Sequence, residues 1–148
     1  MSPSHEITSL DIERLDQYLR AEGLGGGQSL TLTPLSGGQS NPTYRVESGG
    51  ERLVLRKKPS GTLLPGAHAI DREYRVMHAL RETAVPVPRM LSFCEDVTVL
   101  GTPFYLMEWL EGRVLVDQSL PGMRPHERTA IYGEMNRVIA ALHALQPA

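Results

Sequence analysis

The fold class of this chain is decided by a stretch that reads Tyr44-Arg45-Val46-Glu47-Ser48-Gly49-Gly50-Glu51-Arg52-Leu53-Val54-Leu55. Its Gly-Gly pair separates two short runs, the first alternating apolar with polar residues and the second apolar throughout. Two such runs around a Gly-Gly centre are typical of a β-hairpin, because both central residues of the tight turn need a positive φ. The stretch therefore predicts two adjacent antiparallel strands.

Further elements follow outward from this hairpin. A strand is predicted before it, at Leu30–Thr33, and two more follow near Met90–Cys94 and Pro103–Trp109. Helices are predicted at 8–22, where Thr8 and Asp11 have the spacing of a capping box, and at about 67–81 and 125–145, each with apolar residues at helical spacing. A helix inserted after the third strand of an antiparallel sheet indicates an α+β fold rather than a βαβ alternation.

Composition removes several classes of function. The chain has 148 residues and a formal net charge of −2, which gives no electrostatic reason to expect nucleic acid or a membrane surface as a partner. A single cysteine, Cys94, excludes an intrachain disulfide and a multi-cysteine metal site. No apolar run is long enough to span a membrane, and the first residues lack the layout of a signal peptide. We expect a soluble, cytoplasmic protein.

The turn before the hairpin carries the first candidate for chemistry. It contains Gly37, Gly38, Gln39, Ser40 and Asn41. Glycines let a backbone approach a phosphate closely, and free N–H groups with hydroxyl and amide side chains can donate to its oxygens. The alternative is an ordinary hairpin turn, and no Gly-Lys-Ser/Thr follows that would make it a Walker loop.

Two charged positions come next along the chain. The strand at 53–58 ends in Arg56, Lys57 and Lys58, so it delivers a cation that can neutralise phosphate, or it is an edge strand blunted by charge. Glu73 follows Arg56 by 17 positions, on the predicted helix. Its carboxylate can hold the strand cation extended, or it can be an ordinary solvated helix residue.

The last candidate is the exit of the final strand, at 104–112, where an apolar run leads into a polar segment that ends in glycine. Exposed backbone groups there can pair with a flat heterocycle such as adenine. The alternative is an unremarkable strand end. The order of glycine turn, strand cation, helix glutamate and strand exit follows the small lobe of protein-kinase-like folds.

The chain resembles the N-terminal portion of the aminoglycoside phosphotransferase family. It is most similar to the bacterial branch related to the kinase-like domain of certain acyl-CoA dehydrogenase family members. The resemblance lies in residues 36–46, 53–80, 85–91, 101–113 and 121–145. It implies a kinase-like small lobe with an antiparallel sheet of about five strands and one packed helix, at 1–110 together with the leading helix. Residues 111–148 would be the hinge and the first helical part of an incomplete large lobe.

The resemblance also assigns roles. Gly37, Gly38, Gln39, Ser40 and Asn41 would cover the phosphates of ATP, and the other implied nucleotide-binding residues are Arg56, Glu73, Met107, Glu108 and Leu110. Arg56 stands where the family usually has a lysine, with Glu73 as its partner. The main chain of Glu108 and Leu110 would pair with the adenine edge, with Met107 behind it. Lys57 would point to the opposite strand face and is the second choice for the phosphate cation.

The family's catalytic loop has the pattern H-x-D-x-x-x-x-N, and none of the five histidines begins it. We therefore expect no catalytic residue and no metal ligand in this chain, with the ligands of Mg²⁺ outside it. The family implies transfer of a phosphate from ATP to an unidentified small hydroxyl-bearing substrate, with this chain alone inactive. The alternatives are a non-catalytic nucleotide-binding or regulatory module and an inactive gene fragment. An uncovered apolar stripe at 131–145 predicts self-association.

Overall fold

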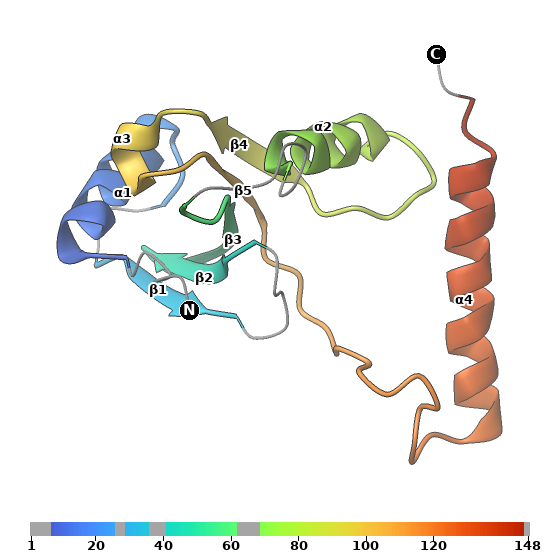
Figure 1. The fold of residues 1–148 in the computed structure, drawn as a ribbon. Helices are drawn as coiled ribbons and strands as arrows, with labels where there is room; N and C mark the ends of the chain where they lie inside the picture. Colours follow the sequence, from blue (N-terminus) through green and yellow to red (C-terminus); the bar gives the residue numbers. More distant parts are fainter. Residues whose placement is uncertain (1–6, 26–28, 36–40, 62–68, 147–148) are drawn as a thin grey trace.

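The computed structural model describes residues 7–25, 29–35, 41–61 and 69–146. Five antiparallel strands form one sheet in the order β1-β2-β3-β5-β4. The strands are β1 (Thr31–Pro34), β2 (Thr43–Ser48), β3 (Glu51–Lys57), β4 (Met90–Cys94) and β5 (Phe104–Glu108). The helices are α1 (Ser9–Ala21), α2 (Ile70–Leu80), α3 (Val97–Leu100) and α4 (Pro125–His143). The predicted α+β class and five-stranded antiparallel sheet are confirmed (Figure 1).

The hairpin at the centre of the sequence forms as predicted. β2 and β3 pair antiparallel from Thr43↔Arg56 to Ser48↔Glu51. The turn between them has φ of 59° at Gly49 and 86° at Gly50. Residues other than glycine rarely adopt these values, so the Gly-Gly pair fixes the turn and with it the register of both strands.

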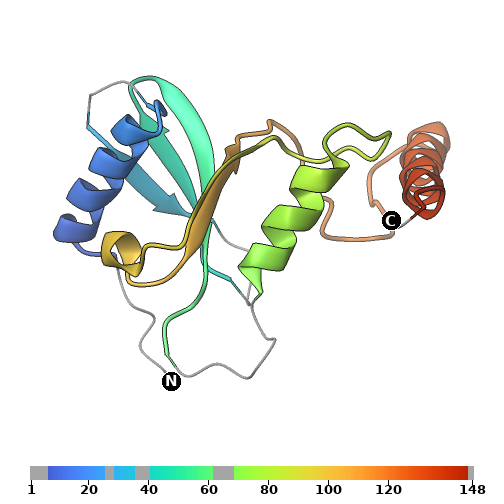
Figure 2. The same cartoon turned by 90° about the horizontal axis from the view of Figure 1, so that it is seen from above.

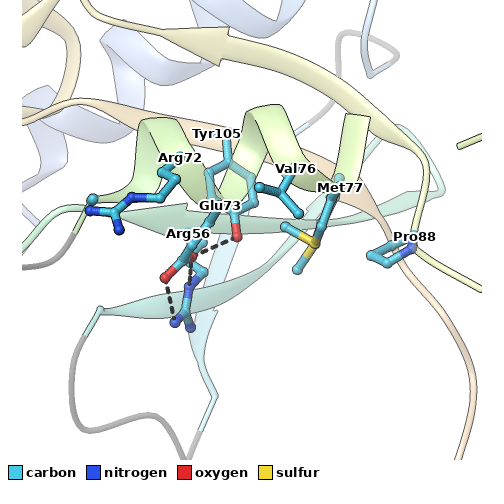
Figure 3. Close-up of a pocket in the computed structure, with 9 residues that line it drawn as sticks. Arg56, Arg72, Glu73, Val76, Met77, Pro88 and Tyr105 are labelled. Carbon is cyan, nitrogen blue, oxygen red and sulfur yellow. Dashed lines mark hydrogen bonds and ion pairs between the residues drawn. The ribbon is translucent and has the colours of Figure 1, made fainter. Parts of the chain in front are cut away.

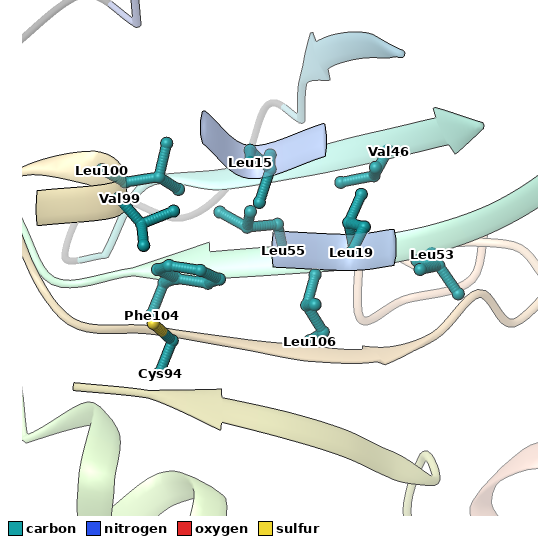
Figure 4. Packing of buried hydrophobic residues seen from close by; sticks show 10 residues of the cluster. All are labelled: Leu15, Leu19, Val46, Leu53, Leu55, Cys94, Val99, Leu100, Phe104 and Leu106. Atoms are coloured by element: carbon teal, nitrogen blue, oxygen red, sulfur yellow. The ribbon is translucent and has the colours of Figure 1, made fainter. Parts of the chain in front are cut away.

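One face of the sheet is closed by α1 and α3. Leu15 and Leu19 of α1 are fully buried against Leu55 of β3 and Phe104 of β5, as Figure 4 shows. The predicted capping box begins α1: the Thr8 hydroxyl accepts from the Asp11 N–H, and the Asp11 carboxylate accepts from the Thr8 N–H. This cap satisfies backbone donors at the start of the helix that packs on the core.

The short helix α3 was not predicted. Residues 95–101 were expected to be only a connection between two strands, because four residues are too few to show a helical period. The Asp96 side chain accepts from the Thr98 N–H at the start of α3, and Gly101 ends the helix with φ of 77°. The helix brings Val99 and Leu100 into the core.

The opposite face of the sheet carries α2, which contacts β4 and β5 (Figure 2). Tyr74 of α2 stacks on Phe93 of β4 with ring centroids 5.3 Å apart, and its ring lies 5.9 Å from that of Tyr105. The described part of α2 begins at Ile70 rather than at residue 67. Within the described ranges, its packing leaves the β2–β3 side of this face without a covering helix.

Helix α4 stands apart from the sheet at the end of an extended segment (Figures 1 and 2). None of its residues is buried. The apolar stripe predicted at 131–145 is uncovered, with Met135, Ile139 and Leu142 each about half exposed. Within the described ranges, no helix combines the length and the apolar character that crossing a bilayer requires.

Candidate functional site

Arg56 and Glu73 meet on the face of the sheet that carries α2, which we call the open face because α2 covers only part of it. Arg56 Nε donates to Glu73 Oε2 at 2.8 Å, and Arg56 Nη2 lies 3.5 Å from Oε1 (Figure 3). The two side chains come from the end of β3 and the first turn of α2. The predicted contact between the strand cation and the helix carboxylate is therefore confirmed.

Lys57 points to the other face, as strand alternation requires. Its side chain is buried, and its Nζ donates to the Leu100 carbonyl at 2.9 Å. Burial lowers the pKa of Lys57 from its ordinary value, and the charge of Asp11 opposes that effect. Of the two candidate cations, Arg56 is therefore the one that faces Glu73, and Lys57 is turned to the opposite face of the sheet.

Two neutral side chains complete the surroundings of the Glu73 carboxylate. Asn41 Nδ2 donates to Oε1 at 3.0 Å, and the Tyr105 hydroxyl donates to Oε2 at 3.1 Å. Tyr105 stands opposite Arg56 in the β3–β5 register. Burial, with the charge of Glu73, raises the pKa of the Tyr105 phenol far above its ordinary value, so it remains a neutral donor.

The Arg56 guanidinium has more N–H groups than its acceptors among the described residues use. A guanidinium has five N–H groups. Toward described residues Nε and one hydrogen of Nη2 face Glu73, and one hydrogen of Nη1 is donated to Thr43 Oγ1 at 3.0 Å. The Arg56 side chain is 25% exposed. Among the described residues, two N–H groups of this partly exposed cation therefore have no acceptor, and such groups suit an anion.

A cavity of about 710 Å³ opens beside this pair (Figure 3). Its size is within the range of small-molecule sites, roughly 300–1,000 Å³. Charged side chains lie at one end of the cavity. Apolar side chains line the rest, and they come from α2, from the segment that precedes β4, and from β5. The lining residues are Arg56, Ala69, Arg72, Glu73, Val76, Met77, Pro88, Tyr105 and Met107. The arrangement suits a ligand with an anionic end and a less polar body.

The end of β5 holds the residues predicted for the base. Met107 lines the cavity, Glu108 ends the strand, and Leu110 is exposed just beyond it. The Glu108 N–H is already donated to the Arg89 carbonyl at 3.0 Å. Sequence reasoning missed Trp109, whose ring centroid lies 5.9 Å from the guanidinium carbon of Arg45 and 5.9 Å from that of Arg52.

Gly37, Gly38, Gln39 and Ser40 lie outside the described residues; only Asn41 of that predicted turn is placed. Thr43 and Tyr105 were also missed. Their signal is strand register, since both pair directly with Arg56, and register is visible only once the sheet is assembled. Across the described ranges, no cluster of three or more His, Cys, Asp or Glu side chains has the arrangement to hold a metal ion.

Comparison with known proteins supplies an independent line of evidence. The family model described as "Phosphotransferase enzyme family" matches residues 31–148. Acyl-CoA dehydrogenase family member 10 of Mus musculus is 48% identical over 146 residues, covering 97% of this chain and 14% of that protein. Acyl-CoA dehydrogenase family member 11 of Homo sapiens is 43% identical over 144 residues, covering 97% and 18% respectively.

A solved structure is also similar. The crystal structure of a "putative aminoglycoside phosphotransferase" from Ralstonia eutropha JMP134 has a TM-score of 0.75 and 51% sequence identity, covering 90% of this chain and 38% of that one. The chain thus spans less than a fifth of the length of the two curated relatives and well under half of the solved relative.

Proposed function

The chain belongs to the phosphotransferase enzyme family, and from this premise we propose that it binds ATP for transfer of the terminal phosphate to a hydroxyl group of a small molecule. The observation that carries the proposal is the Arg56–Glu73 pair on the open face of the sheet, beside a cavity of about 710 Å³. A fixed cation with unused N–H groups is the feature that a triphosphate requires.

Arginine suits this task in its own way. Its planar guanidinium can donate two parallel hydrogen bonds to a phosphate, whereas a lysine acts as a point charge. Glu73 sets the direction of Arg56, and Thr43 holds Nη1 from the neighbouring strand. We propose that the remaining N–H groups of Arg56 bind phosphate oxygens, with Gly37, Gly38, Gln39, Ser40 and Asn41 covering the phosphates from the other side.

The base would lie at the exit of β5. From Tyr105, level with Arg56, to Leu110 is five residues, or roughly 17 Å of extended chain, which separates a phosphate end from a base end. We propose that the Glu108 carbonyl and the Leu110 backbone pair with the adenine edge, with Met107 behind it. Trp109, the only tryptophan in the chain, then serves as a fluorescent reporter of nucleotide binding.

The rest of the reaction requires groups that we assign to residues outside these 148. Mg²⁺ neutralises phosphate charge in this chemistry and needs carboxylate or amide ligands. The Glu73 carboxylate is already occupied by Arg56, Asn41 and Tyr105, so it does not fit the role of a metal ligand. We propose that the chain contributes ATP binding, that it does not transfer phosphate alone, and that the metal ligands and catalytic base lie in the remainder of the family's domain.

The uncovered stripe of α4 has a place in this proposal. Ile131, Met135, Val138 and Ile139 line an apolar groove of about 600 Å³ on the helix surface. Apolar patches of this kind favour association. We propose that isolated chains pair through the stripe at 131–145, which buries the surface.

ATP binding is tested by titrating the 148-residue chain with ATP while Trp109 fluorescence and the unfolding temperature are recorded. At an ATP concentration about 100 times Kd, binding stabilises the folded chain by about 2.7 kcal/mol. Arg56→Ala should abolish this stabilisation. Arg75→Ala is the matched control, because Arg75 is exposed on α2 and, among the described residues, pairs only with the Asp71 side chain and carbonyl.

Absence of any ATP effect on the wild-type chain contradicts the proposed function and favours an inactive fragment. If Arg56→Ala and Arg75→Ala lose the ATP-dependent stabilisation equally, the assignment of phosphate binding to Arg56 is contradicted. Phosphate transfer from ATP by this chain without further residues contradicts the division of roles, whereas binding without transfer agrees with it.

A further inference from the structure

The Glu73 carboxylate is the meeting point of several elements of the lobe. α2 supplies Glu73 itself, β3 supplies Arg56, and β5 supplies Tyr105, while Asn41 lies two residues before the start of β2. We infer that Tyr105 is a positioning residue, which together with Asn41 holds the Glu73 carboxylate so that Arg56 stays directed at the bound phosphate. This inference rests on the proposed function.

The contacts form a closed ring. Arg56 Nε donates to Glu73, and Asn41 Nδ2 donates to the same carboxylate. The Thr43 hydroxyl donates to the backbone carbonyl of Asn41 at 3.1 Å, and its oxygen in turn accepts from Arg56 Nη1. Every member of the ring has its partner within the ring, so the groups strengthen one another and limit the conformations of each side chain.

Tyr105 joins this ring from outside. Its hydroxyl takes the position on Glu73 Oε2 that the ring leaves open, so each carboxylate oxygen receives one arginine N–H and one neutral donor. Without Tyr105 the carboxylate can rotate or bind water on that side. A rotated carboxylate no longer presents both oxygens to Arg56, and the guanidinium loses its fixed direction.

Burial and ring packing restrict the position of the Tyr105 hydroxyl. Tyr105 is 1% exposed, and its ring is packed beside Tyr74 of α2. A buried hydroxyl that lacks a partner is costly, so the Tyr105 hydroxyl requires the Glu73 carboxylate as its acceptor. Asn41, 2% exposed, lies directly after the segment 36–40, and it links the proposed phosphate-covering turn to α2 through Glu73.

A purely structural role for Tyr105 is the competing explanation, and Tyr105→Phe separates the two because it keeps the ring and removes only the hydroxyl. Tyr44→Phe is the matched control. Tyr44 lies on β2 but packs against the core on the closed face. ATP affinity of each variant is measured through Trp109 fluorescence. We expect Tyr105→Phe to weaken ATP binding about three- to tenfold, the effect of roughly one hydrogen bond, and Tyr44→Phe to leave it unchanged.

A double-mutant cycle gives the decisive readout. If Tyr105 acts through Glu73, Tyr105→Phe has no further effect on ATP affinity in a Glu73→Ala background. Equal effects of Tyr105→Phe with and without Glu73 overturn the inference, as does unchanged affinity in the single variant, while the proposed function stands in both cases.

A measurement on the free chain keeps the inference testable even if the wild-type chain binds no ATP, a result that would end the proposed function. Hydrogen exchange of the Arg56 Nε–H, followed by nitrogen-15 NMR, reports how firmly Glu73 holds the guanidinium. Faster exchange in Tyr105→Phe than in Tyr44→Phe supports the positioning role, and equal exchange in the two variants overturns it.

Discussion

Arg56 and Lys57 are neighbours in β3, yet the sheet places them in opposite environments. Lys57 enters the face closed by α1 and α3, where it is buried and donates to the Leu100 carbonyl. Arg56 enters the face that α2 covers only in part, where it is 25% exposed and bound to Glu73. The same kind of charge therefore holds the fold together on one face and remains available to a ligand on the other.

The difference between the two faces lies in what covers them. The closed face contains the main apolar cluster, including Leu15, Leu55 and Phe104, all fully buried. The open face carries polar groups that satisfy one another around Glu73. Stability should therefore depend mainly on the closed face and ligand binding mainly on the open one.

The largest effect is expected for Phe104→Ala. Phe104 is fully buried and meets Tyr18 edge to face, with centroids 5.3 Å apart. Removing its ring leaves a cavity and should lower the free energy of unfolding by about 3–5 kcal/mol, measured by urea denaturation. Val76→Ala, a change at a half-exposed residue on the open face, should cost far less. Similar losses in both variants would contradict the separation.

The next largest effect is expected when each of the neighbouring cations, Lys57 and Arg56, is replaced by methionine. Lys57→Met leaves the Leu100 carbonyl without its buried donor, so we expect a loss of about 1–3 kcal/mol of stability and unchanged ATP affinity in the folded chain. Arg56→Met should do the reverse, with loss of ATP binding and a smaller change in stability. Denaturation curves and ATP titrations of both variants test whether Lys57 serves stability and Arg56 serves ATP binding. Loss of ATP binding in Lys57→Met would refute this division.

The third effect appears at alkaline pH. Burial raises the pKa of Tyr105, so the folded chain keeps a proton that the unfolded chain releases above about pH 10. The stabilising contribution of the protonated phenol is complete below that pH and declines as pH rises further. The decline is at most about 1.4 kcal/mol per pH unit for this one group. Tyr105→Phe should lose stability less steeply than wild type in urea denaturation above about pH 10; parallel pH profiles would show that Tyr105 does not titrate as inferred.

The sequence predicts the frame of this lobe because its signals are local. The Gly49–Gly50 turn, the capping box of Thr8 and Asp11 and the periodic apolar residues each act within a few positions. The boundary at Ile70 and the helix α3 were not predicted, since neither is marked by a period long enough to read. Packing against the core, together with the Asp96 cap and Gly101, places Val99 and Leu100.

The site could be predicted only in part. Arg56 and Glu73 follow from strand alternation, helix spacing and the family resemblance, and their contact is confirmed. Thr43 and Tyr105 reach the same cluster through pairing across the sheet, which depends on how strands far apart in the sequence assemble. No short motif around Tyr105 marks it as a partner of Glu73, so its contact with the carboxylate had to come from the structure.

The smallest effect on stability is expected in α4, which belongs to neither face of the sheet. Met135 is 52% exposed and lies in the apolar groove of the stripe, so Met135→Glu should change the unfolding free energy by less than about 0.5 kcal/mol. The same change should prevent chains from pairing through 131–145, because a carboxylate in an apolar contact is costly to desolvate. Light scattering at rising concentration should show association of the wild-type chain and a monomer for Met135→Glu. Asn136→Glu is the matched control, since Asn136 lies outside that groove and should leave association intact. A wild-type chain that stays monomeric throughout would show that the exposed stripe does not drive pairing.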